Sequence, residues 1–133
     1  MAVENNELYK VGLAHAEALE KLGVDLYPAE PFRRTHLAKD LITNFDHLKG
    51  QVVRIAGRIV AFRDHGNLVF ADIEDESGSI QTGNTKKELG DSFPLFREHY
   101  WPGDFIGTVG ELTKTRRGEI SVLANTNTML AKA

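Results

Sequence analysis

Cysteine is absent from the 133 residues of this chain. A disulfide framework and a thiolate metal site are therefore excluded, and a cytoplasmic protein is compatible with the composition. No apolar run approaches the roughly 18 residues that a membrane-spanning helix needs. The opening residues, MAVENNELYK, lack the basic start and apolar block of a signal peptide. These absences lead us to expect a soluble cytoplasmic protein with no membrane partner.

An excess of positive charge is also missing. The chain has 16 Lys and Arg against 19 Asp and Glu, which gives a net charge of −3. Proteins that hold nucleic acid through bulk electrostatics are usually basic. Any contact with nucleic acid must therefore come from a local patch and from stacking. The apolar content of 41% and the length predict one folded domain with a helical appendage.

The first part of the chain has helical spacing. A helix is predicted over 4–22 because apolar residues recur on one face, at Leu8, Val11, Ala14, Ala18 and Leu22. Two prolines in 27–35 predict an extended linker. Thr35 is placed to cap a second helix over 36–47. We assign 1–50 to an N-terminal helical extension and linker.

From Gln51 onward the apolar residues recur with a period of two, which is typical of strands. Gly57 predicts a bend or bulge in the first strand. The connection over 86–100 contains a helix that Gly90 and Pro94 are expected to break. Strands are predicted at 51–63, 68–75, 79–81, 104–115 and 119–130. This mainly β order, with a helix between the third and fourth strands, predicts a five-stranded OB-fold Greek-key barrel over 51–133.

Phe70 lies in the middle of the second predicted strand, LVFADIED. Alternation places it on the same face as Asp72, whereas Val69, Ala71 and Ile73 form the opposite, uniformly apolar face. An aromatic on the polar face of a small barrel can stack a nucleic-acid base. Most aromatics in small domains serve packing, and the pattern alone favours packing for Phe70.

Other kinds of chemistry have less support. The histidines are scattered without ligand spacing, so no metal site is predicted. Asp72 and Glu74 share a strand face, as a general acid and base would, but no nucleophile accompanies them and solvated charge is the better interpretation. The segment GELTKTRRG lacks the spacing of a phosphate loop. Arg117 in this segment either solubilises a hairpin or binds phosphate.

Two stretches carry a family resemblance, GRIVAFRDHGNLVFADIEDESGSIQ and DFIGTVGELTKTRRGEIS. With the preceding GVDLYP and FRRTH and the final MLAKA, they resemble the N-terminal anticodon-binding domain of class II lysyl-tRNA synthetases. Aspartyl- and asparaginyl-tRNA synthetases share the strand-turn-strand core. The resemblance covers about residues 19–132 and implies the OB fold derived above.

The resemblance implies a surface that reads an anticodon with a central uridine. It implies that Phe70 stacks on that base and that Gln81 hydrogen-bonds the edge of the base. A glutamine amide both donates and accepts, as uridine requires. It further implies that Glu119 contacts an anticodon base and that Arg63 contacts the backbone or a base. The candidate RNA-binding residues are Arg58, Arg63, Phe70, Gln81, Arg117 and Glu119.

The resemblance also implies what a larger enzyme would do around this chain. The sequence ends at Ala133 before any class II catalytic motif, so we expect no catalysis by this chain alone. We expect no cofactor in it, because ATP and Mg²⁺ would be bound by the catalytic domain. The parent enzyme is expected to be a homodimer and this fragment a monomer, with a tRNA anticodon loop as its partner.

The chain departs from the family pattern where contact surface or positive charge is expected. The family continues after Gln81 with an apolar or aromatic strand, whereas here the sequence is Thr-Gly-Asn-Thr. An alternative is therefore an OB-fold scaffold with a rebuilt face, natural or engineered, that binds protein or ligand. It predicts that the altered positions cluster on one surface, namely Phe62, Asn67, Thr82, Gly83, Asn84 and Thr113. A third hypothesis is association through exposed apolar surface.

Overall fold

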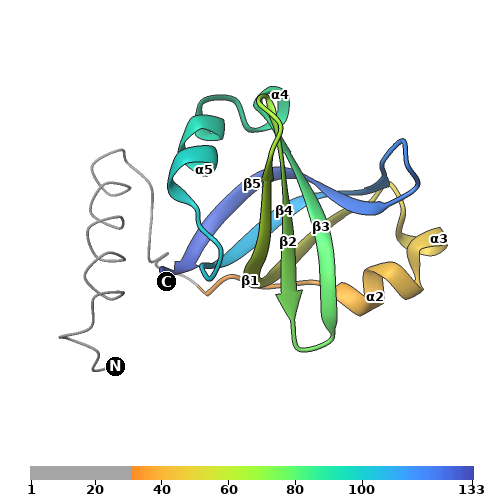
Figure 1. The fold of residues 1–133 in the computed structure, drawn as a ribbon. Coiled ribbons are helices and arrows are strands. Elements are labelled where there is room, and N and C mark those ends of the chain that lie inside the picture. The colour runs from red at the N-terminus through yellow and green to blue at the C-terminus, as the bar shows by residue number, and fades with distance from the viewer. Residues whose placement is uncertain (1–30) are drawn as a thin grey trace.

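The computed structural model describes residues 31–133. The helix predicted over 4–22 and the first part of the linker over 27–35 lie outside the described residues. Five strands form a closed barrel in the order β1-β2-β3-β5-β4 (Figure 1). Their bounds are β1 Val52–Asp64, β2 Leu68–Asp75, β3 Gly78–Thr85, β4 Phe105–Lys114 and β5 Ile120–Ala131. The predicted mainly β architecture, with helices before the barrel and between β3 and β4, is confirmed.

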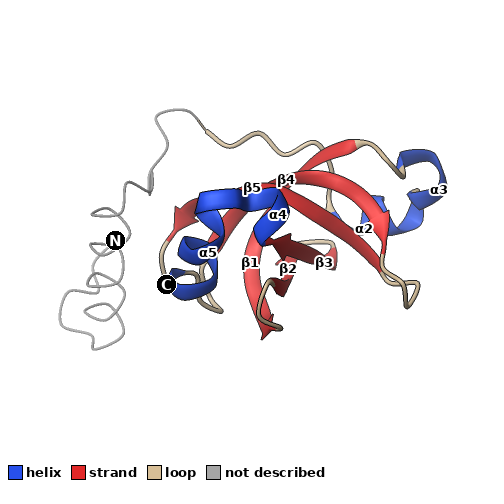
Figure 2. Ribbon diagram, turned by 90° about the horizontal axis from the view of Figure 1, so that it is seen from above, coloured by secondary structure: helices blue, strands red, loops and turns tan. Residues whose placement is uncertain are grey.

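The helices lie at two places on the barrel (Figure 2). Before β1 come α2, Ala38–Thr43, and α3, Phe45–Leu48. Between β3 and β4 come α4, Lys86–Leu89, the short 3-10 helix η1, Gly90–Ser92, and α5, Phe93–His99. The connection over 86–100 is thus helical and interrupted at Gly90, as predicted. Pro94 does not break it, because it lies in the first turn of α5. Backbone N–H groups in the first turn of a helix have no acceptor within the helix, so a proline there costs no hydrogen bond.

The helix predicted over 36–47 begins later, at Ala38, and is divided at Asn44 into α2 and α3, and Thr35 does not cap it. The N-cap is Leu37, whose backbone N–H donates to the Asp40 side chain at 3.1 Å. The next N–H group, of Ala38, donates to a carboxylate oxygen of Asp75 at 2.8 Å. The β2–β3 turn therefore supplies capping groups. The Thr35 hydroxyl instead accepts a hydrogen bond from the backbone N–H of Arg54 at 2.9 Å. This bond connects the segment that precedes α2 to β1.

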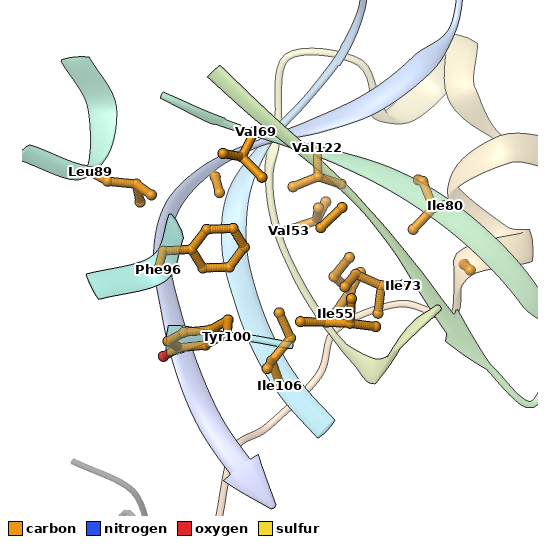
Figure 3. Close-up of a cluster of buried hydrophobic side chains, with 14 of the residues drawn as sticks. Val53, Ile55, Val69, Ile73, Ile80, Leu89, Phe96, Tyr100, Ile106 and Val122 are labelled. Carbon is orange, nitrogen blue, oxygen red and sulfur yellow. The ribbon is translucent and has the colours of Figure 1, made fainter. Parts of the chain in front are cut away.

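The core fills the barrel interior with residues from the inward faces of the strands (Figure 3). Val69, Ala71 and Ile73 of β2 are all buried there, as the alternation predicted. Phe96 of α5 and Tyr100 just after it extend the core at one end, with ring centroids 4.8 Å apart. The aromatic stretch before β4 therefore closes that end of the barrel.

The predicted bulge in β1 occurs at another residue. The β1–β2 register shifts between Ile59 and Ala61, beyond Gly57. Gly57 is required for a different reason: a Cβ there would lie 2.3 Å from the backbone oxygen of Glu74. The two strands thus approach too closely at this position for any side chain on the first one.

The predicted end of the third strand at Gln81 is wrong, because β3 continues to Thr85. Thr82 and Asn84 are fully buried inside the barrel, where the Asn84 amide nitrogen donates to the Thr82 hydroxyl at 3.0 Å. Asn127 of β5 donates to the Asn84 amide oxygen at 2.9 Å and accepts from the Thr108 hydroxyl at 2.7 Å. The side chains of Thr82 and Asn84 are thus satisfied inside the barrel, so the strand continues beyond Gln81 although no apolar residue follows there.

Candidate nucleic-acid interface

One outer face of the barrel gathers candidate residues from three neighbouring strands. The register pairs Arg63 of β1 with Phe70 of β2. It also pairs Phe70 with Gly83 and Asp72 with Gln81 of β3. Because paired residues project to the same side of a sheet, these five positions share one surface. We call this surface the Phe70 face.

The neighbouring strand β5 continues the Phe70 face. Its parallel pairing with β3 sets Ser121 beside Gln81 and Leu123 beside Gly83. A Cβ at Gly83 would lie 3.8 Å from the Ser121 hydroxyl oxygen and 3.9 Å from a ring carbon of Phe70. The space beside Gly83, between the aromatic ring and the start of β5, would therefore admit a methyl group with ordinary contacts.

Phe70 lies on the outside of the barrel and is not one of its core residues. It is half-buried, because its neighbours cover part of the ring. The His65 imidazole meets the ring edge to face, with centroids 5.7 Å apart. The Arg63 guanidinium carbon lies 5.9 Å from the ring centroid. The ring is thus held in place by a histidine and a cation while remaining partly open to solvent.

Arg63 is held by two partners on the Phe70 face. Its guanidinium donates two hydrogen bonds to the Asp72 carboxylate, at 3.0 and 3.1 Å. It donates a third to the amide oxygen of Gln81 at 3.0 Å. The hydrogen bonds to Asp72, joined by the charge of Glu119, raise the pKa of Arg63 above its ordinary value. The arginine is therefore an organised part of the surface.

Gln81 has one hydrogen-bonding group without a partner among residues 31–133. Its residue is 8% exposed, and its amide nitrogen Nε2 is buried with no acceptor among the described residues. A buried polar group left without a partner costs about 1–3 kcal/mol. An acceptor that reached this nitrogen would recover that free energy, so the Gln81 amide nitrogen is a candidate polar contact beside Phe70.

The remaining candidates lie at different distances from this surface. Glu119 is exposed just before β5 and contributes to the electrostatic surroundings of Arg63. Arg117 is exposed in the β4–β5 turn. Figure 1 shows this turn on the side of the barrel near α3. Arg58 pairs with Glu74 rather than with Phe70 or Asp72, and its guanidinium carbon lies 4.8 Å from the Phe105 ring centroid. The structure thus brings Arg63, Phe70 and Gln81 together but separates Arg58 from them.

Arg58 instead lines a second surface feature. A hollow of about 380 Å³ lies between the segment that precedes α2, which contributes Arg34, and the β1–β2 pair. Its lining residues are Arg34, Ala56, Gly57, Arg58, Glu74, Asp75, Glu76 and Phe105. Arg34 forms a two-pronged ion pair with Glu76 across it, at 2.8 and 2.7 Å. Charges of both signs surround the hollow, so it lacks the uniform positive field that a phosphate backbone favours.

Sequence reasoning missed three residues of the Phe70 face. His65 was one of the scattered histidines without ligand spacing, Asp72 was interpreted as solvated charge, and Ser121 was not considered. Only Asp72 carried a usable signal, because alternation already placed it on the same face as Phe70. The edge contact of His65 depends on the turn, and the position of Ser121 depends on a parallel pairing of strands that are far apart in the sequence.

The positions that depart from the family pattern do not form one surface. Thr82 and Asn84 are inside the barrel, and Phe62 stacks on Phe96 with centroids 5.5 Å apart. Gly83 lies on the Phe70 face, and Thr113 joins its edge through pairing with Ser121. Because buried and exposed positions are mixed, the clustering that a rebuilt binding face requires is not found.

Two further features bear on the kind of site. Within residues 31–133, no group of three or more histidine, aspartate or glutamate side chains is arranged to hold a metal ion. No helix in the same part of the chain is long and apolar enough to cross a membrane.

Comparison with known proteins gives a consistent result. A family model described as an OB-fold nucleic acid binding domain matches residues 53–130. The lysine–tRNA ligase of Carboxydothermus hydrogenoformans is 45% identical over 131 residues, covering 98% of this chain and 26% of that protein. That of Roseiflexus castenholzii is 42% identical, covering 98% of the chain and 27% of the protein. The lysine–tRNA ligase of Methanospirillum hungatei is 37% identical, covering 90% of this chain and 25% of that protein.

This chain therefore spans about a quarter of the length of these curated relatives. The family match covers nearly the whole barrel from β1 to β5, including every strand of the Phe70 face. The chain belongs to the family of OB-fold nucleic acid binding domains of the tRNA anticodon type, and nearly all of it is similar to one part of the lysine–tRNA ligases.

Proposed function

We propose that this chain binds the anticodon loop of a tRNA on the Phe70 face. The observation that carries the proposal is that an outward aromatic ring lies near an amide donor that has no acceptor among the described residues. Phe70 lies outside the core, and Gln81 is two residues along the neighbouring strand with its Nε2 unpartnered among the described residues. An exposed ring flanked by a polar group is the usual arrangement by which OB folds bind single-stranded bases.

In this proposal Phe70 stacks on the central anticodon base, which is a uridine. Stacking of one base on an aromatic side chain contributes about 1–3 kcal/mol. The amide nitrogen of Gln81 donates to a carbonyl of that base, because uracil presents carbonyl acceptors on its pairing edge. Glu119 contacts a neighbouring base, and Arg63 contributes its charge beside the ring. Arg117 contacts the RNA backbone, whereas Arg58, which lies opposite Glu74 and away from the Phe70 ring, has no part in stacking.

The net charge of −3 supports a small, stacking-based site. A protein that relied on phosphate neutralisation would lose affinity steeply as salt increases. Here the arginine beside the ring, Arg63, is already paired with Asp72. Affinity should therefore come chiefly from the base contacts, and discrimination between bases should be large relative to nonspecific binding.

The remaining functions are assigned to a longer protein of which this chain would be the recognition part. The relatives are named lysine–tRNA ligases, and this chain covers 26% of the one from Carboxydothermus hydrogenoformans. We propose that residues 51–133 form the anticodon-binding unit, with 1–50 as its extension. Attachment of lysine to tRNA, with its ATP and Mg²⁺, belongs to the other part of such an enzyme. We propose a monomeric chain acting in the cytoplasm, with a homodimeric parent.

The proposal is tested by replacing the stacking ring. A uridine-centred anticodon stem-loop is titrated at low salt into the wild type and into Phe70→Ala, with affinity measured by fluorescence anisotropy. Because the ring supplies about 1–3 kcal/mol of stacking, we expect a loss of affinity of roughly 5- to 150-fold. Val60→Ala serves as the control, because Val60 is an exposed apolar residue at the β1 bulge, where the register pairs it with no residue of the Phe70 face.

Two results would contradict this function. One is equal affinity of the wild type and Phe70→Ala for the stem-loop. The other is an absence of binding by the wild type in buffer of low ionic strength. The amide ¹H–¹⁵N spectrum of each variant, compared with that of the wild type, verifies that the barrel remains folded.

A further inference from the structure

The orientation of the Gln81 amide is fixed by its neighbours. The Arg63 guanidinium donates to the amide oxygen of Gln81 at 3.0 Å. A guanidinium has only donors, so the oxygen must face Arg63 and the nitrogen must face away from it. The same guanidinium is held by both carboxylate oxygens of Asp72. Asp72, Arg63 and Gln81 therefore form a chain in which each group sets the direction of the next.

A free glutamine amide does not have a fixed polarity. It can rotate by half a turn and exchange its donor and its acceptor, so it accepts hydrogen bonds from some bases and donates to others. In this protein that rotation would place the amide NH₂ against the donors of Arg63. The acceptor of Gln81 is thus already used, and only Nε2, buried and without an acceptor among the described residues, is left for a ligand.

We propose that Asp72 is a positioning residue that makes this site selective for uridine over cytidine. It acts by holding Arg63, which in turn keeps the Gln81 amide oriented as a donor only. This inference rests on the proposed function, since it concerns the same base site. Uracil offers a carbonyl acceptor at its 4-position, whereas cytosine carries an amino donor there. A cytidine amino group would face the Gln81 NH₂, leaving donors on both sides unsatisfied.

The geometry of Asp72 supports a role beyond surface charge. Asp72 lies directly opposite Gln81 in the β2–β3 register, and its side chain is 31% exposed. Its two oxygens contact two different nitrogens of Arg63, a planar arrangement that fixes the guanidinium in direction as well as in position. Its neighbour on the same face, Glu74, is exposed and lies opposite Arg58 rather than Arg63. Glu74 therefore provides a matched control.

The test compares two stem-loops that differ only in a central uridine or cytidine. Leaving a buried donor unsatisfied predicts a uridine preference of about tenfold or more for the wild type. In Asp72→Asn the bidentate ion pair with Arg63 is lost. The preference for uridine over cytidine should then fall to about threefold or less, while the protein still binds the uridine stem-loop. Glu74→Gln removes the same charge from the same strand face and should keep the wild-type preference.

A second variant tests the direction of the hydrogen bond. Gln81→Glu replaces the donor by an acceptor, which suits the cytosine amino group. We expect its preference to reverse in favour of cytidine. An unchanged ratio in both Asp72→Asn and Gln81→Glu would overturn the inference while leaving RNA binding intact. A wild type that binds both loops equally would also overturn it, and a wild type that binds neither would refute the proposed function itself.

Discussion

Gly57 and Gly83 are both strand glycines, but their surroundings differ. A Cβ at Gly57 would lie 2.3 Å from the Glu74 backbone oxygen and 2.9 Å from a side-chain carbon of Ile73. A Cβ at Gly83 would make only ordinary contacts, the nearest at 3.8 Å. Backbone atoms cannot move aside without displacing a strand, whereas the space beside Gly83 admits a methyl group.

We therefore predict opposite effects of one substitution at the two sites. Gly57→Ala should destabilise the protein by about 2–4 kcal/mol, because β1 and β2 must separate. Gly83→Ala should stabilise it by about 0.5 kcal/mol, because alanine loses less backbone entropy on folding. Urea unfolding at neutral pH measures both free energies. Equal effects at the two positions would contradict this account.

Individual side chains on the Phe70 face were only partly predictable from the sequence. Alternation alone placed Phe70 and Asp72 on one face, because the period of a strand is local. Which carboxylate pairs with Arg63 was not predictable, because Asp72 and Glu74 both project from that face. The register between two strands decides it, and the bulge between Ile59 and Ala61 shifts that register.

At the scale of elements, prediction succeeded where the signal lies within the element. The second strand was predicted at its observed bounds, Leu68–Asp75, because its apolar and polar residues alternate between turn signals. Prediction failed at the end of β3, where Thr82 and Asn84 are buried yet polar. Asn84 bonds to Asn127, which is 43 residues away, and the Thr82 hydroxyl donates to the backbone oxygen of Ala71 on β2, so no local pattern reveals that they are satisfied. Helix α2 also starts late because capping groups come from the β2–β3 turn.

The segment before α2 is fastened to the β2–β3 turn by the ion pair of Arg34 with Glu76. The hydrogen bonds from Arg34 lower the pKa of Glu76 from 4.5 to about 2. Because the folded-state pKa is the lower one, the stabilisation is present above about pH 4.5 and is lost as the pH falls through about 2. Both side chains are largely exposed, so the effect on stability should be small.

Arg34→Gln should raise the pKa of Glu76 toward its ordinary value. The titration is followed by the carboxyl ¹³C shift in a selectively labelled sample, from neutral pH down to about one unit below the lowered pKa. Asp64 is the internal control, since its partner is Arg97 and its own lowered pKa should not change. A Glu76 titration midpoint unaffected by Arg34→Gln would show that the ion pair is not formed in solution.

At the scale of the whole molecule, the barrel depends on how its last strand is held. Just beyond β5, the Lys132 amine contacts the Asp104 carboxylate, and their side chains are only 4% and 0% exposed. Asp104 also accepts the backbone N–H groups of Trp101 and Ala133, at 2.7 and 2.8 Å. Burial lowers the pKa of Lys132, because the amine is desolvated. This ion pair joins the end of β5 to the turn that leads into β4.

Removing one member of this pair should destabilise the whole barrel, because a buried charge would remain uncompensated. For Lys132→Met we predict a loss of about 3–5 kcal/mol in the free energy of unfolding. The double variant Asp104→Asn with Lys132→Met removes both charges, and the amide oxygen of the introduced asparagine can still accept a backbone N–H group. It should therefore be more stable than Lys132→Met alone by at least about 1 kcal/mol. Urea unfolding, followed by the fluorescence of the single tryptophan, measures the stability of the wild type, of Lys132→Met and of the double variant. A double variant less stable than Lys132→Met would show that the pair contributes through packing rather than charge.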